Sequence, residues 1–217
     1  DTAVIINEFG EIGLDHQLIE AAEGDIVLMS SGCLCCTIRN SLVDTLRSLF
    51  EKREQGRVGR FRRVLIETTG LADPAPILQT LMQEPYIKLR YGLDSVVATV
   101  DALHGERQLD EHIESVKQAA VADRILLTKT DLVPAGQAER IASRLKALNP
   151  AAPVVIAIQG EVDPALLFDA GLYDPAARIP DVLRWLGAES HSQGHDPDHG
   201  HARDVNRHDA RIQAHCL

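Results

Sequence analysis

Val64-Leu65-Ile66-Glu67-Thr68-Thr69-Gly70 is the stretch of sequence that decides the fold. Its three apolar residues predict a buried strand, and the strand ends in a carboxylate, two hydroxyls and a glycine. A carboxylate at a strand tip can hold Mg²⁺ directly or through water, and a glycine N–H beside it can approach a terminal phosphate. A motif this short can also occur by chance, and the alternative is then an ordinary strand end with a capped turn.

Similar apolar runs recur on both sides of this stretch, and each is followed by a segment that can be helical. They are residues 3–6, 95–100, 124–128 and 154–158. This alternation predicts an α/β fold with a doubly wound, mostly parallel sheet that is covered on both faces. Ligands of such sheets bind beyond the carboxyl ends of the strands, so the polar residues that follow each run are the candidates for function.

Two helix signals support this architecture. Asp73 followed by Pro74 suits the N-cap and the first position of a helix. Residues 41–50 have helical periodicity, which places three leucines on one face: Leu42, Leu46 and Leu49. Both features predict packing of helices against the sheet.

Composition and charge exclude some partners. The chain has 217 residues, 45% of them hydrophobic, which suits one main core with appendages. Its 22 basic and 32 acidic residues give a formal net charge of -10, so a phosphate backbone would be repelled and nucleic acid is not an expected partner. No apolar run is long enough to span a membrane, and we expect a soluble, cytoplasmic protein.

The cysteine cluster is the strongest chemical signal in the sequence. Cys33, Cys35 and Cys36 place three soft ligands within four positions, which suits a thiophilic ion such as Zn²⁺, Cu⁺ or Co²⁺. A tetrahedral shell needs at least one further ligand, and Glu8 or Glu11 could supply it. The alternatives are buried free cysteines, a redox dithiol of Cys33 with Cys36, and solvated loop acids.

Another polar motif follows the run at 124–128. Its residues Thr128, Lys129, Thr130 and Asp131 resemble the Asn-Lys-x-Asp motif by which GTPases read guanine. A carboxylate such as Asp131 can accept the N1–H and 2-amino hydrogens of guanine, which adenine does not offer, while the stem of Lys129 can lie along the base. Thr128 departs from the asparagine of that motif. A surface turn after a strand is the alternative.

The C-terminal part changes in character after residue 187. Residues 188–208 are rich in His, Asp and Gly, which predicts a flexible linker whose histidines scavenge metal loosely or form a solvated tether. Residues 209–217 look like the start of a further domain. We therefore expect a nucleotide- and metal-binding domain at 1–187, followed by this linker and a truncated domain.

Five segments, taken in order, resemble the CobW-like subfamily of P-loop GTPases over roughly residues 1–175. They are residues 6–11, 32–36, 67–74, 100–102 and 128–131. The resemblance implies a P-loop GTPase-like three-layer sandwich that uses GTP and Mg²⁺ and carries Zn²⁺ or Co²⁺. It also implies delivery of the ion to a client metalloprotein, coupled to GTP hydrolysis.

The resemblance also implies roles for the candidates. Residues 8–11 correspond to switch I, residues 67–70 to switch II, and the three cysteines to the metal site, whose shell Glu8 or Glu11 could complete. Glu67 and Gly70 are the expected catalytic residues. The expected nucleotide-binding residues are Thr68, Thr69, Gly70, Thr128, Lys129 and Asp131.

The family also carries a Gly-x-x-x-x-Gly-Lys-Thr loop before the first segment and a second domain after a His-rich linker. Neither occurs in these 217 residues. We expect the chain alone to bind GTP poorly and to be inactive, because positioning and neutralising the phosphates is most of the catalysis in such enzymes. A homodimer around the nucleotide, a non-enzymatic metal buffer and a P-loop ATPase or kinase of another family remain open.

Overall fold

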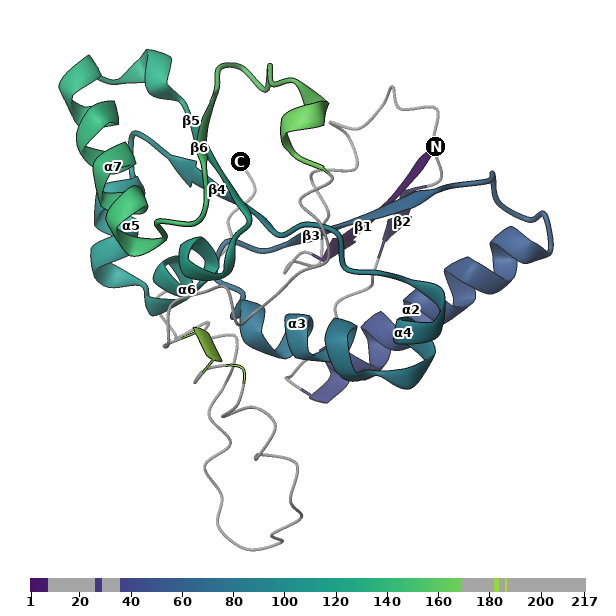
Figure 1. The fold of residues 1–217 in the computed structure, drawn as a ribbon. Coiled ribbons are helices and arrows are strands. Elements are labelled where there is room, and N and C mark those ends of the chain that lie inside the picture. Colours follow the sequence, from purple (N-terminus) through teal and green to yellow (C-terminus); the bar gives the residue numbers. More distant parts are fainter. Residues whose placement is uncertain (8–25, 29–35, 169–181, 184–185, 187–217) are drawn as a thin grey trace, which may run out of the picture. The chain divides into compact units, whose positions relative to one another are not determined.

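The computed structural model describes residues 1–7, 26–28, 36–168, 182–183 and 186 of the chain. The chain divides into two compact units, with the boundary between Ala72 and Asp73. Each unit contains a three-stranded parallel sheet of its own. Figure 1 labels strands β1, β2 and β3 of the first sheet and β4, β5 and β6 of the second.

The first unit contains strands β1 (Thr2–Asn7), β2 (Ile26–Leu28) and β3 (Arg63–Thr68) in the order β2-β1-β3. β1 is central and buried, with Ile5 at 0% exposure, because it has a strand on each side. The register pairs Ile6 with Glu67 and Asn7 with Thr68, so the carboxyl ends of β1 and β3 lie side by side.

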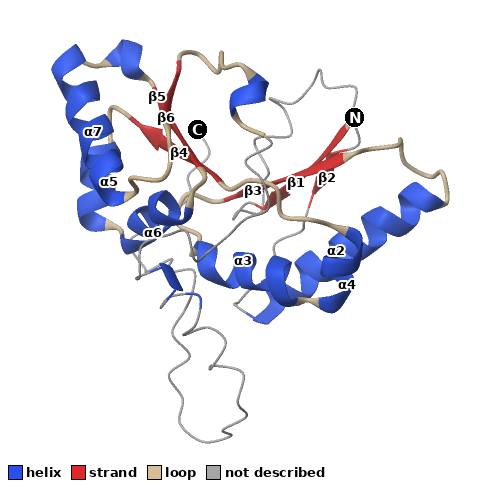
Figure 2. Cartoon of the chain, in the orientation of Figure 1, coloured by secondary structure: helices blue, strands red, loops and turns tan. Residues whose placement is uncertain are grey.

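Helix α2 (Cys36–Glu54) connects β2 to β3 (Figure 2). Its three leucines at 42, 46 and 49 are all buried, which confirms the predicted apolar face. Near the end of the helix the Arg53 guanidinium lies over the rings of Phe50 and Phe61, at 4.7 and 5.1 Å from their centroids. These cation–π contacts fix the turn from α2 into β3.

The second unit is built on β4 (Val97–Asp101), β5 (Arg124–Thr128) and β6 (Val154–Ala157), in that order. Asp101 pairs with Thr128, and Thr128 pairs with Ala157. The three carboxyl ends therefore lie in register, and residues that follow neighbouring strands are brought together at one edge of this sheet.

Five α-helices of the described residues belong to this unit: α3 (Pro74–Gln83), α4 (Pro85–Arg90), α5 (Gly105–Glu111), α6 (Ile113–Val121) and α7 (Ala135–Leu148). One core joins β4 and β5 to α5, α6 and α7. Its most buried large side chains are Ile125, Leu127, Ile141 and Leu145. A second cluster packs α3 and α6 against Val182 and Leu186.

The start of α3 follows the sequence prediction. Asp73 is the N-cap, with its Oδ1 accepting the N–H of Ala75 at 3.0 Å, and Pro74 occupies the first turn. The other oxygen, Oδ2, forms an ion pair with the Lys117 ammonium of α6, and both side chains are largely buried. This aspartate therefore joins two helices of the second unit as well as capping one.

Asn149, directly after α7, provides hydrogen-bond donors for the carbonyl groups at the C-terminal end of α6. Its buried Nδ2 donates to the carbonyl oxygens of Ala119, Ala120 and Ala122 at 2.9, 3.1 and 2.9 Å, and its Oδ1 accepts the Ala152 N–H at 3.2 Å. Carbonyls at a helix C-terminus have no partner within the helix, so this one side chain supplies it.

The predicted α/β architecture with parallel strands is confirmed, and all five apolar runs form strands. β2 was not predicted, because three residues are too few to show a pattern. The expected linker at 188–208 and the segment at 209–217 lie outside the described residues. None of the described helices combines the length and apolar character needed to cross a membrane.

Candidate functional site

The turn after β5 carries the Thr-Lys-x-Asp segment. Lys129 adopts the left-handed conformation, with φ 56° and ψ 29°, and a short 3₁₀ helix, η1 (Thr130–Leu132), follows. This conformation costs a non-glycine residue about 1 kcal/mol, so the surrounding contacts must hold it. The turn leaves Lys129 and Asp131 exposed beyond the carboxyl end of β5.

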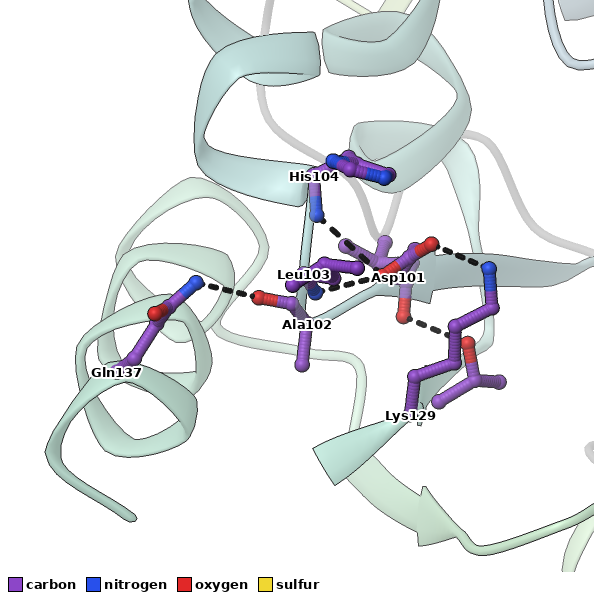
Figure 3. Close-up of polar contacts among 8 residues, drawn as sticks. Asp101, Ala102, Leu103, His104, Lys129 and Gln137 are labelled. Carbon is purple, nitrogen blue, oxygen red and sulfur yellow. Dashed lines mark hydrogen bonds and ion pairs between the residues drawn. The ribbon is translucent and has the colours of Figure 1, made fainter. Parts of the chain in front are cut away.

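Asp101 at the end of β4 supplies the main contact to this turn (Figure 3). Its Oδ2 forms an ion pair with the Lys129 Nζ at 2.6 Å. Its Oδ1 accepts the backbone N–H groups of Leu103 at 2.6 Å and His104 at 3.3 Å. One carboxylate therefore ties the β4–α5 turn to the β5–η1 turn.

The environment keeps this carboxylate ionised. Partial burial disfavours the charged form and raises the pKa of Asp101, but the Lys129 ammonium and the N–H groups of Leu103 and His104 together outweigh burial. The net effect lowers the pKa of Asp101 below its ordinary value. At neutral pH the pair with Lys129 is thus a pair of opposite charges.

Backbone contacts reinforce the link between the two strand ends. The Ala102 N–H donates to the Thr128 carbonyl at 2.9 Å, and the Thr128 hydroxyl donates to the Val100 carbonyl at 3.3 Å. From α7, the Gln137 side-chain amide donates to the Ala102 carbonyl at 2.9 Å (Figure 3). The threonine that stands in the asparagine position of the motif thus binds the neighbouring strand.

In the first unit, residues 67–70 comprise the last two residues of β3 and the turn after it. Glu67 and Gly70 are exposed, while the Thr69 hydroxyl oxygen is buried and lacks a hydrogen-bond partner among the residues that the structure describes. Apart from the two neighbours of Gly70 in the chain, a Cβ added at this glycine would meet no atom of the described residues within 4 Å. This segment therefore offers an accessible carboxylate, open space at a glycine and an unsatisfied hydroxyl.

Most of the predicted metal ligands lie outside the residues that the structure describes. Glu8, Glu11, Cys33 and Cys35 lie outside the described residues, and Cys36 is the first residue of α2. Within the described part of the chain, no group of three His, Cys, Asp or Glu side chains could hold a metal ion. The cysteine site stays a prediction.

Sequence reasoning assigned no role to Asp101, which entered only through the Val-Asp-Ala segment of the resemblance. A signal was available, because this acid ends a strand of a parallel sheet at the edge where Thr128 ends the next one. Gln137 gave no signal at all. It contacts Ala102 from a distant position on α7.

Parallel strands with helical crossovers, and polar side chains gathered at their carboxyl ends, define the class of α/β nucleotide-binding proteins. The model of the CobW/HypB/UreG nucleotide-binding domain family matches residues 1–156 of the chain. The chain belongs to this family, and its fold is that of P-loop GTPases.

Individual relatives agree with this assignment. The zinc chaperone YjiA of Escherichia coli K12 is 44% identical over 167 residues, which cover 77% of this chain and 52% of YjiA. The zinc chaperone CobW of Pseudomonas aeruginosa is 32% identical over 198 residues, covering 76% of this chain and 51% of CobW. This chain spans about half the length of the curated relatives it matches.

A solved structure is similar as well. The crystal structure of zinc-bound YjiA GTPase from E. coli matches with a TM-score of 0.61 and 36% sequence identity. The match covers 80% of this chain and 54% of that one. The identity and the shared fold together support the family assignment.

Proposed function

We propose that this chain is the nucleotide- and metal-binding part of a GTP-dependent metallochaperone. It binds Zn²⁺ or Co²⁺ and delivers the ion to a client metalloprotein as GTP is hydrolysed. Support comes from relatives named zinc chaperones and from a Schizosaccharomyces pombe relative, 30% identical, named zinc-regulated GTPase metalloprotein activator 1. These names describe the relatives, and the activity of this protein is our proposal.

The turn after β5 is the observation that carries the nucleotide part of the proposal. Left-handed Lys129 and the following 3₁₀ turn leave Asp131 exposed beyond the strand end. In this proposal the Asp131 carboxylate accepts the N1–H and 2-amino hydrogens of guanine, and the Lys129 stem lies along the base. Thr128 keeps the turn attached to β4 through its hydroxyl.

Residues 67–70 suit the phosphate and magnesium end of the nucleotide. The exposed Glu67 would hold Mg²⁺ directly or through water, and the Gly70 N–H would donate to the terminal phosphate. In this proposal the hydroxyls of Thr68 and Thr69 also belong to the nucleotide site. The Thr69 hydroxyl is buried without a hydrogen-bond partner among the described residues, and buried polar groups usually bond to protein, water or a ligand. When bound, Mg²⁺ neutralises charge on the phosphates.

The cargo ion is proposed to bind Cys33, Cys35 and Cys36, with Glu8 or Glu11 completing the shell. GTP orders residues 8–11 and 67–70 and closes the thiolate site, and hydrolysis opens it for transfer. Coupling of this kind is reciprocal, so the metal must tighten GTP binding by the factor with which GTP tightens metal binding. We propose that metal delivery takes place in the cytoplasm. We also propose that two copies of the protein form a homodimer around the nucleotide.

The test is the zinc affinity of the full-length protein in complex with a non-hydrolysable GTP analogue or with GDP, measured by competition with a chromophoric chelator. We expect tighter binding with the GTP analogue, and a Cys33→Ser/Cys36→Ser variant is expected to lose both the binding and the difference. Equal affinities in the two nucleotide states would contradict the coupling. Absence of GTP turnover with and without zinc would favour a non-enzymatic metal buffer instead.

The alternative of a P-loop ATPase or kinase from another family loses its support through the family match. It predicts equal binding of GTP and ATP. Nucleotide competition with the full-length protein would decide between the two, because only the proposed function requires a preference for guanine.

A further inference from the structure

The ion pair between Asp101 and Lys129 joins the ends of two strands at the proposed base site. Lys129 lies one residue beyond β5 and two residues before Asp131. Its ammonium is 2.6 Å from the Asp101 Oδ2, yet the lysine side chain is 52% exposed and that of Asp101 only 16%. The lysine is thus held by its ammonium, while about half of its side chain stays exposed.

This geometry changes what the lysine can offer. Its charge is already balanced by Asp101, and a ligand that contacts the exposed half of the side chain can pack against the hydrocarbon stem. A free lysine side chain samples many rotamers, and a lysine that is fixed beforehand loses less conformational entropy when a ligand binds. The pair therefore preorganises an apolar edge beside Asp131.

The aspartate is itself held in place. Its second oxygen accepts the N–H groups of Leu103 and His104, at 2.6 and 3.3 Å. The next residue, Ala102, is buried and bonded on both sides, to Thr128 through its N–H and to Gln137 through its carbonyl (Figure 3). Asp101 is therefore a fixed point against which Lys129 is positioned.

We propose that Asp101 is a positioning residue for guanine recognition, which holds the stem of Lys129 where the base binds and slows nucleotide release without contacting the nucleotide. This inference rests on the proposed function and adds a residue to which that function gave no role. The ion pair also helps to hold the left-handed turn at Lys129, whose backbone conformation is unfavourable for lysine.

The experiment measures dissociation of a fluorescent GDP analogue from the full-length protein by stopped flow. Asp101→Asn keeps an oxygen that can accept from Leu103 and His104 but removes the charge that holds Lys129. We expect dissociation about tenfold faster, a similar effect for Lys129→Met, and little further change in the double variant, because the two residues act as one unit.

A matched control comes from another aspartate of the same unit. Asp110 forms a 2.7 Å pair with Arg144, and its side chain is 66% exposed. Asp110→Asn removes the same charge from an ion pair of similar length that is more exposed and lies away from the site, and we expect GDP to dissociate at the wild-type rate. Zinc affinity without nucleotide and the melting temperature are measured on all variants. A purely structural role for Asp101 would lower the melting temperature without the non-additive effect on GDP release.

The outcomes separate the inference from the function on which it rests. Wild-type release of GDP in Asp101→Asn, or fully additive effects in the double variant, would overturn the inference alone. Equal binding of GDP and ADP by the wild-type protein would overturn the proposed function and the inference with it. If Asp101→Asn fails to fold, Lys129→Met on the wild-type and on an Asp101→Glu background provides the same comparison.

Discussion

At the scale of single residues, the carboxylate of Asp131 carries the proposed choice of base. Asp131 lies on η1 and its side chain is exposed. Among the described residues of the site, it is the carboxylate that follows the left-handed residue Lys129. The asparagine side chain has the same shape but can accept only through one oxygen and carries no charge. The preference for guanine should therefore be lost when Asp131 is replaced by asparagine.

We predict that Asp131→Asn lowers guanine nucleotide affinity of the full-length protein by about 1 to 3 kcal/mol, the cost of a lost polar pair. Adenine nucleotide affinity should not change, because adenine has neither the N1–H nor the 2-amino group that this carboxylate accepts from in guanine. Competition titration with GDP and ADP measures both. Equal losses for the two nucleotides would show that Asp131 supports the turn and does not read the base.

Asn149 is a second residue on which much depends, this time for stability. Its amide serves three carbonyl oxygens at the end of α6. Asn149→Asp replaces this donor with a charged acceptor, and we expect a loss of about 3 kcal/mol or more in the free energy of unfolding. Urea denaturation measures it. The exposed Gln108→Glu makes the same chemical change and should stay within about 0.5 kcal/mol of wild type.

At the scale of elements, Asp73 shows how a residue that the sequence identifies can have a second role that it does not show. The N-cap of α3 was predictable because Asp-Pro is a local signal. The ion pair with Lys117 was not, since it depends on how α3 packs against α6. Local chemistry can be read from neighbours in sequence, whereas contacts between elements need the fold.

We predict that Asp73→Ala destabilises the protein by about 2 to 3 kcal/mol, because it removes both the cap and the partner of a largely buried lysine. Asp73→Asn can still cap the helix and should lose less. Both are measured by urea denaturation. Asp44→Ala is the control: Asp44 is 73% exposed and 3.9 Å from Arg47, so its pair should contribute little.

The link between the β4 and β5 ends should depend on pH. The folded state lowers the pKa of Asp101, so its ion pair adds stability above the ordinary aspartate pKa, about 4, and loses it as the pH falls through the lower folded pKa. The difference in unfolding free energy between wild type and Asp101→Asn should therefore shrink below about pH 4. Urea titrations at several pH values measure it, and a constant difference would contradict the expectation.

At the scale of the whole molecule, continuous apolar runs predicted the strands and the parallel architecture well, because such runs are typical of parallel strands. Burial of both faces was not predicted correctly for every described strand, since Leu65, Val97 and Ile156 are exposed. The division at Ala72 and the pairing of Asp101 with Lys129, 28 positions apart, were not predictable. Such features arise from register between strands, which no single segment encodes. The cysteine site depends on residues outside the described part of the chain.

The affinity of these 217 residues for nucleotide can also be predicted from their motifs. The 217 residues contain no Gly-x-x-x-x-Gly-Lys-Thr loop, so we expect them alone to bind a fluorescent GDP analogue weakly and to hydrolyse no GTP. A full-length protein with such a loop should bind at least tenfold more tightly, since each phosphate contact adds charge-assisted hydrogen bonds. Fluorescence titration of the two proteins compares them. Equal affinities would show that the loop is dispensable.

The parallel pairing of the strands also governs how the protein is made. Val4 of the central strand β1 pairs with Leu65, so one side of β1 stays open until the ribosome has released β3 and α2 has crossed over. No hairpin can protect that edge in the meantime. The nascent chain therefore exposes an unpaired apolar strand edge until Thr68 has been made and released, and this is the stage at which it would most need a folding chaperone.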